Sequence, residues 1–238
     1  MEQIKYYMAP MEGVTGYVYR NAYAKYYGGI VRYFTPFVAN KKLGHREKND
    51  VCPEHNAGMA VVPQILTNRA EDFLAIAEIL REYGYDTVNL NLGCPSGTVA
   101  ARGRGAGFLA MPDELDHFLE EIFEKCPLRI SIKTRIGKEN PAEWERLLAI
   151  YEKYPLEELI VHPRVQTDFY KNRVNLEAFA RAEKNSRHSL CYNGDIVDAA
   201  SAAHIREGFP SVDKFMIGRG LIKHPWLLEE LSGGRQEK

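Results

Sequence analysis

The sequence predicts an α/β fold, specifically a TIM (β/α)8 barrel, from three observations. The chain has 238 residues, close to the roughly 250 of a typical barrel and above the lower limit of about 200. Short apolar runs alternate with helical patterns, which predicts parallel strands joined by right-handed crossovers. Eight such runs occur, and this number favours closure into a barrel.

A doubly wound open sheet is the alternative fold. Such a sheet usually carries a G-x-G-x-x-G stretch after an early strand, where the glycines approach a dinucleotide. The one comparable stretch is GRGAG, Gly103–Gly107, and it follows the fourth apolar run. The pattern therefore favours the barrel.

The expected strands are apolar runs, each followed by a turn. The fourth, TVNLNL, also alternates between apolar and polar residues, as a β-strand does. In chain order, the expected strands are Tyr6–Met11, Ile30–Phe37, Met59–Ile65, Thr87–Leu92, Arg129–Arg135, Glu158–Arg164, Leu190–Gly194 and Lys214–Arg219.

Four helical patterns lie between these strands. Arg69–Gly84 has apolar residues at three- and four-residue spacing and ends on a glycine. Met111–Cys126 has a proline and acidic residues in its first turn, as a helix N-terminus favours. Asn140–Tyr154 is similar, and Asp198–Gly208 also ends on a glycine. The polar residues 40–58 are expected to form a long loop.

The composition is that of a globular protein with a substantial core, since 45% of residues are apolar. The formal net charge of −1 provides no overall field to draw the protein onto nucleic acid or a membrane. The N-terminus does not resemble a signal peptide, and no apolar run approaches the roughly 18 residues that span a bilayer. We therefore expect a cytoplasmic protein without a membrane partner.

The four cysteines are Cys52, Cys94, Cys126 and Cys191. They form no C-x-x-C pair, so we expect neither a zinc site nor an iron–sulfur cluster. We expect all four to be free thiols. Cys94 differs from the others because it lies on a Gly-Cys-Pro turn directly after a strand, with Asn91 three residues before it. This context predicts a presented thiol, whereas the other three are expected to be structural or incidental.

Functional residues of a barrel gather at the carboxyl ends of its strands. Lys133 alternates with Ile130 and Ile132, so it is expected to point into the barrel, where an unpaired lysine is costly. Seven strands end in polar or special residues, namely Pro10, Met11, Glu12, Gln64, Asn91, Cys94, Lys133, Arg135, His162, Arg164, Asn193, Gly194, Asp195, Gly218, Arg219 and Gly220.

Three of these positions have a structural alternative. His162 could be a core histidine, and Asp195 could cap the helix that follows it. The Gly218–Gly220 stretch could be a simple turn. After the last strand of a barrel, however, glycines free backbone N–H groups for a phosphate, and Arg219 adds positive charge.

Seven motifs, in this order, resemble those of the tRNA-dihydrouridine synthases along nearly the whole chain. They are MAPMEGVT (Met8–Thr15), VPQI (Val62–Ile65), NLGCP with VAARGRGAGFL (Asn91–Leu109), SIKTR (Ser131–Arg135), VHPR (Val161–Arg164), NGDI (Asn193–Ile196) and MIGRG (Met216–Gly220). The resemblance implies an FMN-binding TIM barrel over residues 1–230. It also implies that NADPH reduces the flavin, which then reduces the 5,6 double bond of particular uridines in tRNA.

The resemblance further implies a role for each residue. Cys94 would donate the proton, and Asn91, Arg135 and Arg164 would contact the RNA. Gln64 and Lys133 would hydrogen-bond the polar edge of the flavin. The other cofactor-binding residues would be Pro10, Met11 and Glu12 against the isoalloxazine ring, and His162, Asn193, Gly194, Asp195, Gly218 and Arg219 towards the ribityl–phosphate end.

The chain departs from the family pattern at three places. Residues 231–238 stand where the family's helical RNA-binding domain should begin, so we expect that domain to be missing or truncated. Binding of tRNA would then be weaker, because phosphate neutralisation carries much of such binding. The sixth strand ends in His-Pro-Arg, with Pro163 in place of the usual glycine. The loop PSGTV lacks the lysine that the family often carries before the valine.

Two other functions are compatible with this fold. One is an FMN-dependent barrel reductase that acts on a small conjugated molecule rather than on tRNA, which the expected lack of a helical domain favours. The other is an RNA-binding barrel that has lost catalysis. The presence of Cys94, Lys133 and Gln64 argues against the second alternative.

Overall fold

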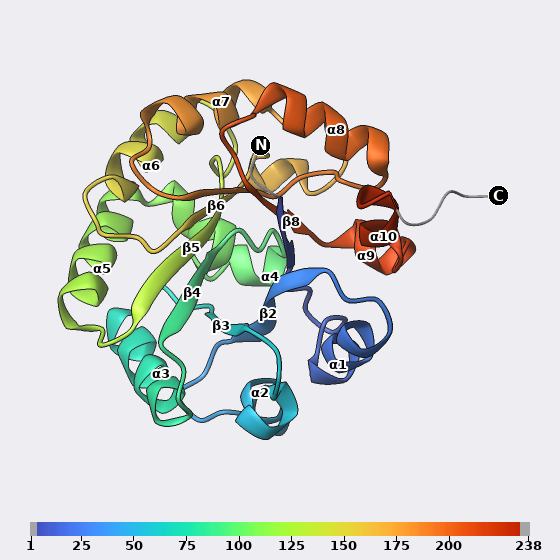
Figure 1. Ribbon diagram of the computed structural model, residues 1–238. Coiled ribbons are helices and arrows are strands. Elements are labelled where there is room, and N and C mark those ends of the chain that lie inside the picture. The colour runs from blue at the N-terminus through green and yellow to red at the C-terminus, as the bar shows by residue number, and fades with distance from the viewer. Residues whose placement is uncertain (1–3, 234–238) are drawn as a thin grey trace.

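Eight parallel strands form a closed barrel in the computed structural model, which describes residues 4–233. Each strand pairs with its neighbour in chain order, and β8 returns to pair with β1. The predicted TIM barrel is confirmed, with a ring of helices outside the strands (Figure 1). The strands are β1 Lys5–Met8, β2 Ile30–Val38, β3 Val61–Ile65, β4 Thr87–Leu92, β5 Arg129–Arg135, β6 Leu159–His162, β7 Leu190–Tyr192 and β8 Lys214–Ile217.

The strand boundaries show where regular pairing stops and the loops begin. β4 and β5 have the predicted bounds, whereas β1, β6, β7 and β8 end two or three residues earlier than expected. At β1 the cause is local: Pro10 has no N–H, and the Met11 N–H donates to Thr15 Oγ1 at 2.7 Å instead of to a strand. Most of the predicted site residues therefore lie on loops that directly follow the strands.

The helices cover the outer surface of the barrel (Figure 1). Four of them fall within the predicted segments: α3 Ala70–Glu82, α5 Pro112–Lys125, α6 Glu143–Tyr151 and α8 Ala199–Gly208. The others are α1 Tyr17–Tyr26, α2 His45–Val51, α4 Gly97–Ala100, α7 Leu176–Asn185, α9 Arg219–Lys223 and α10 Leu227–Leu231, with 3-10 turns η1 Pro53–Asn56, η2 Gly105–Ala110 and η3 Gln166–Asp168. Within residues 4–233, no helix has the length and apolar character that a bilayer span requires.

The expected boundary at residue 230 falls inside α10, one residue before its end. Residues 234–238 of the expected tail lie outside the described residues. All four cysteines are free thiols.

Alternation along the strands separates an apolar core under the helices from a barrel interior that is polar at its carboxyl end. Ile130 and Ile132 of β5 pack in the main core under the helices, as do the alternate residues of β4. Lys133 lies on the other side of β5 and lines a cavity, in line with the predicted alternation. Below it, the interior is filled by a small apolar cluster that includes Phe34 and Met216.

The prediction of a long loop over residues 40–58 is wrong, because this segment contains α2 and η1. The start of α2 is stabilised by Glu47, whose carboxylate accepts the backbone N–H groups of Gly44 at 2.7 Å and Ala39 at 3.1 Å. The bond from Gly44 satisfies a donor that the helix N-terminus leaves free, and the bond from Ala39 ties α2 to the end of β2. The helix was not predicted because the segment is polar and the helix buries only two residues, Asp50 and Val51.

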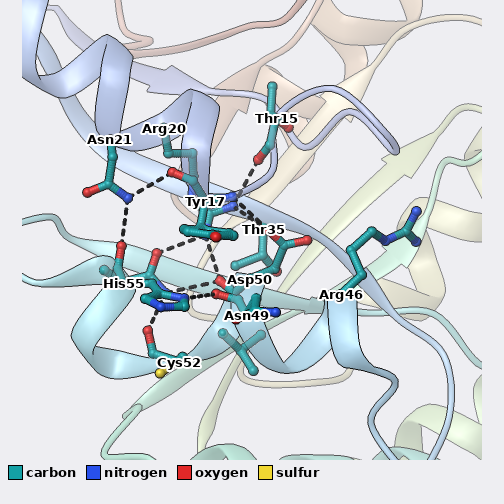
Figure 2. Close-up of polar contacts among 12 residues, drawn as sticks. Thr15, Tyr17, Arg20, Asn21, Thr35, Arg46, Asn49, Asp50, Cys52 and His55 are labelled. Carbon is teal, nitrogen blue, oxygen red and sulfur yellow. Dashed lines mark hydrogen bonds and ion pairs between the residues drawn. The ribbon is translucent and has the colours of Figure 1, made fainter.

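A buried arginine, Arg20 of α1, holds α2 and η1 against the barrel (Figure 2). Its guanidinium donates to the carbonyl oxygens of Thr15 at 2.8 Å and Asp50 at 2.6 Å, and to Asn56 Oδ1 at 2.8 Å. The Asp50 carboxylate in turn accepts the N–H of Tyr17 at 2.7 Å. One side chain of α1 thus joins the start of the chain to α2 and η1, which lie 30 and 36 residues further along the sequence.

The buried Arg20 guanidinium also lies 3.9 Å from the Asp50 carboxylate. We predict that Arg20→Met lowers the free energy of unfolding by about 3–5 kcal/mol, because it leaves this buried carboxylate without its cation. Urea unfolding followed by circular dichroism measures the change. Arg81→Ala is the matched control, since Arg81 is exposed and pairs with Glu78 on the surface of α3. Such pairs contribute about 0–1 kcal/mol, so equal losses in the two variants would disprove the role of Arg20.

Candidate active site

A cavity of about 400 Å³ opens at the carboxyl ends of the strands. A hollow at the amino ends is larger, at about 1080 Å³, so size does not decide between the two. The convergence of polar and ionisable groups marks the first cavity as the candidate site. It is lined by seven of the predicted site residues, namely Pro10, Met11, Glu12, Gln64, Asn91, Cys94 and Lys133.

Asn91 holds the turn that presents Cys94. Asn91 Oδ1 accepts the backbone N–H groups of Gly93 at 3.0 Å and of Cys94 at 2.9 Å. Asparagine favours such local side-chain-to-backbone bonds in turns. This geometry explains the three-residue spacing between Asn91 and Cys94, and contact of Asn91 with a substrate stays a prediction.

A chain of amide hydrogen bonds crosses the barrel interior and ends at Asn91. Asn91 Nδ2 donates to Gln64 Oε1 at 2.7 Å, and Gln64 Nε2 donates to Asn89 Oδ1 at 2.7 Å. Asn89 Nδ2 then donates to Ser131 Oγ at 2.9 Å. Each amide has a fixed orientation as a result. Sequence reasoning missed Asn89 and Ser131, although the polar positions of TVNLNL and RISIKTR were the available signal.

Cys94 and Lys133 have opposite pKa shifts with the same main cause. Burial raises the pKa of the Cys94 thiol, against the opposing effects of the Ser96 backbone and Lys133. Burial, followed by the positive charge of Arg135, lowers the pKa of Lys133 to about 8. Among the described residues, Lys133 has neither a hydrogen-bond partner nor an ion-pair partner. Its ammonium group is therefore available to a ligand in the cavity.

Arg135 joins the Cys94 turn to the loop after β6. The side chain is 1% exposed. Its guanidinium donates to the carbonyl oxygens of Gly93 at 3.1 Å, Val165 at 2.8 Å and Phe169 at 2.7 Å. Buried carbonyl groups require such partners. The arrangement favours a positioning role over direct contact with an RNA substrate.

Asp195 binds two arginines, and none of the three residues is among those that line the cavity. Arg164 bonds both carboxylate oxygens of Asp195, and Arg219 donates to the same group at 2.6 Å. Although burial alone would raise it, these two cations lower the pKa of Asp195. Arg164 is 2% exposed and also donates to the Asn172 carbonyl oxygen at 2.7 Å. Arg164, like Arg135, therefore supports a loop.

His162 is a neutral histidine inside this positive cluster. Arg164 donates to its Nε2 at 3.0 Å, and a guanidinium can only donate, so the ring carries its proton on Nδ1. Burial, followed by the charges of Lys133 and Arg135, keeps the pKa of His162 well below its usual range. The histidine is buried, but it is part of the polar site rather than of the apolar core.

The alternative reading of Asp195 as a helix cap is wrong. Asp198 caps α8, with its Oδ1 accepting the Ser201 N–H at 2.7 Å. On the preceding turn, a Cβ atom at Gly194 would lie 2.2 Å from the Tyr192 hydroxyl oxygen, so only glycine fits. Asn193 Nδ2 donates to the Met216 carbonyl oxygen at 2.8 Å and ties this turn to β8. Gly218 immediately precedes α9, which begins at Arg219.

The loop after β1 forms the remaining side of the cavity. The Met11 N–H is bound by Thr15, and the Glu12 carboxylate pairs with Arg46 of α2. Burial raises the pKa of Glu12, and Arg46 opposes that shift. The unpredicted helix α2 therefore contributes a charged residue to the rim of the site.

The charge balance of the site suits an anionic ligand. Lys133, Arg135, Arg164 and Arg219 all act on His162, whereas Asp195 neutralises two of these cations. An acceptor-rich ring that carries a phosphate, such as FMN, fits the unpartnered Lys133 and this excess of positive charge.

Three aromatic residues that line the cavity were not predicted as site residues, namely Phe37 of β2 and the adjacent Phe169 and Tyr170. Phe169 and Tyr170 follow η3 and line the cavity beside Cys94. The Tyr170 ring lies over the guanidinium of Arg219 at 4.5 Å and that of Arg135 at 5.3 Å. The sequence feature that could have indicated Phe169 and Tyr170 is an aromatic pair within the polar stretch QTDFYKNR, which follows the motif at the end of β6.

Solved structures with the same fold include a mutant of morphinone reductase and a variant of NCR. Morphinone reductase has a TM-score of 0.66 and 13% sequence identity, and the match covers 97% of this chain and 87% of that one. A variant of NCR from Zymomonas mobilis has a TM-score of 0.64 and 14% identity, with 98% of this chain and 88% of that chain covered. At these identities the similarity shows the fold alone.

Curated relatives are more informative. The tRNA-dihydrouridine synthase B of Pasteurella multocida (strain Pm70) is 26% identical over 225 residues, which is 93% of this chain and 67% of the relative. The probable tRNA-dihydrouridine synthase 2 of Bacillus subtilis (strain 168) is 27% identical over 232 residues, or 94% and 70% of the two chains. The family model for dihydrouridine synthase (Dus) matches residues 7–238. The chain therefore belongs to the dihydrouridine synthase family.

Proposed function

We propose that this protein reduces the 5,6 double bond of uridines in tRNA to form dihydrouridine, with FMN as cofactor and NADPH as reductant. The observation that carries the proposal is the Cys94 thiol, presented to a cavity that also contains the unpartnered Lys133. Family membership supports it, as do the names of the relatives from Pasteurella multocida and Bacillus subtilis.

The residues that would hold FMN come from the ends of six strands. Lys133 would stabilise negative charge on the reduced ring, and Gln64 would bond its polar edge. The loop of Pro10, Met11 and Glu12 would lie against the ring. The phosphate end would be held by the remaining predicted residues, His162, Asn193, Gly194, Asp195, Gly218 and Arg219, where the arginine cluster provides the positive charge.

Cys94 would complete the reduction by donating a proton. When bound, reduced FMN supplies the hydride that adds to C6 of the uracil. Negative charge then spreads over C5, C4 and O4 of the base, and C5 requires a proton. The S–H bond of Cys94 breaks as the C5–H bond forms, and the thiolate regains a proton from solvent.

The environment of Cys94 suits an acid rather than a nucleophile. A nucleophilic cysteine needs a lowered pKa, because the thiolate is the reactive species. The pKa of Cys94 is instead raised by burial, so the thiol stays protonated at neutral pH. Asn91 and Arg135 hold the turn on both sides of it, which would keep the donor in place during the reaction.

The target uridine has to leave its stack to reach the cavity, at a cost of a few kcal/mol. Contacts with the RNA backbone would offset this cost. Arg135 and Arg164 are buried, so we assign them to positioning the loops. Exposed basic residues near the rim are better placed to contact phosphates, namely Arg102, Lys171 and Arg173.

We predict that the purified protein is yellow and that its flavin absorbance is bleached by NADPH without oxygen. The bleached protein should then convert uridine to dihydrouridine in an unmodified tRNA transcript, as measured by mass spectrometry of the digested RNA. Cys94→Ala should reduce the rate of dihydrouridine formation by about 10²–10⁴-fold, the usual contribution of a general acid.

Cys126→Ala is the matched control, because Cys126 follows the carboxyl end of α5, away from the cavity. Its rate should equal that of the unaltered protein. A flavin that is bleached by NADPH and reoxidised by an enone, with tRNA left unmodified, would identify the alternative function of a small-molecule reductase. A protein that cannot be loaded with FMN would refute the reductase proposal altogether.

We predict that Cys94 is alkylated by iodoacetamide more slowly than a free cysteine at neutral pH, because less of the thiol is ionised. Its pH profile should have a midpoint above the ordinary thiol value of about 8.5. Mass spectrometry of the Cys94 peptide gives the profile, and a midpoint below that of free cysteine would rule out the acid role.

A further inference from the structure

A strained turn places Phe169 at the mouth of the cavity. The Lys171 N–H donates to the Asp168 carbonyl oxygen at 3.0 Å and closes a four-residue turn. Its first central residue, Phe169, has φ 49° and ψ −99°. These angles are near those of the first central position of a type II′ turn, about +60° and −120°, which glycine normally occupies. Phe169 is the one non-glycine residue with positive φ in the described chain.

The Phe169 side chain gains little packing in return for this strain. It is 42% exposed and lines the cavity that contains Cys94. It stacks on none of the aromatic rings of residues 4–233. Its neighbour Tyr170, in contrast, lies over Arg219 and Arg135 and is edge-on to His162. Strained residues that persist without a structural benefit often serve function.

Two side chains, Arg135 and Gln166, fix the position of the Phe169 turn relative to the Cys94 turn. Arg135 donates to the Phe169 carbonyl oxygen at 2.7 Å and to the Gly93 carbonyl oxygen at 3.1 Å, so one guanidinium holds both turns. Gln166 Nε2 donates to the carbonyl oxygen of Pro95 at 2.9 Å. The exposed Phe169 ring and Cys94 therefore line the same cavity from two turns that Arg135 joins.

We propose that Phe169 is the side chain on which a nucleobase of the RNA substrate stacks at the mouth of the cavity. The inference rests on the proposed function and names a residue that binds its substrate. An exposed aromatic ring suits a base that has left its stack, because every base has a π-face and such stacking is tolerant of sequence. The basic residues Lys171 and Arg173 follow directly and suit the adjoining phosphates.

The first test measures kinetics with an unmodified tRNA transcript. Phe169→Ala should raise KM for tRNA by about tenfold, equivalent to about 1.4 kcal/mol, and change kcat much less. Phe169→Tyr retains an aromatic ring and should restore most of the affinity, whereas Phe169→Leu should not. Tyr26→Ala is the control, since Tyr26 is 68% exposed at the opposite end of the barrel and should leave KM unaltered.

The second test separates strain from binding. Phe169→Gly and Phe169→Ala both remove the ring, but only glycine adopts this conformation without strain. The glycine variant should therefore unfold at a temperature about 2–4 °C above the alanine variant, while both show the same rise in KM. Equal unfolding temperatures would overturn the claim that the turn is strained.

The kinetic outcomes also distinguish failure of this inference from failure of the proposed function. A protein that loads FMN but leaves tRNA unmodified refutes both. A protein that forms dihydrouridine, with KM unchanged in Phe169→Ala, refutes the stacking role alone. If Phe169→Ala instead slows the reduction of bound flavin by NADPH as much as it weakens tRNA binding, the ring covers the flavin, and the inference is overturned.

Discussion

Positive charge held inside the mouth of the barrel is the constraint on which the site depends. Burying a charge without partners is costly, and each cation is compensated in a different way. Arg135 donates to three carbonyl oxygens, and Arg164 and Arg219 share Asp195. Lys133 has no such partner in the described residues, and its lowered pKa reflects that cost. Folding thus leaves one cation ready for a ligand.

The same compensation builds the loops of the site. Because Arg135 binds carbonyl groups of both the Cys94 turn and the loop after β6, neither loop can move without losing a buried hydrogen bond. Arg164 connects the loops after β6 and β7 through Asp195. Arg135 and Arg164, which the family resemblance assigns to the substrate, therefore bind backbone carbonyl groups of the protein instead. Phe169, whose carbonyl group Arg135 binds, has its side chain in the lining of the cavity.

Residues at strand ends were the part of the site that the sequence could predict. Strand alternation is local, so it correctly oriented Lys133, and the Gly-Cys-Pro turn correctly indicated a presented Cys94. The partners were not predictable, because they are determined by contacts between distant segments. The Asn89–Gln64–Asn91 chain requires knowledge of which strands are adjacent, and Asp195 differs from the cap Asp198 only through the arginines that reach it.

The prediction of a loop after β2 was wrong for a related reason. Its polar composition indicates a loop, and its helix is stabilised by the remote Arg20 and by a carboxylate three residues inside its own start. The strained turn at Phe169 also has no sequence signature, since glycine is the residue that the conformation favours. Such local conflicts between sequence and structure are expected at functional sites.

The measurement that tests the central claim most directly compares FMN and riboflavin binding to the flavin-free protein by fluorescence quenching. The two ligands share the ring and differ only in the phosphate. If the arginine cluster is an anion site, FMN should bind at least about 100-fold more tightly, as two charge-assisted hydrogen bonds of about 1.5–3 kcal/mol each imply. Arg219→Met should reduce the ratio of the affinity for FMN to the affinity for riboflavin. Equal affinities for FMN and riboflavin would contradict the account.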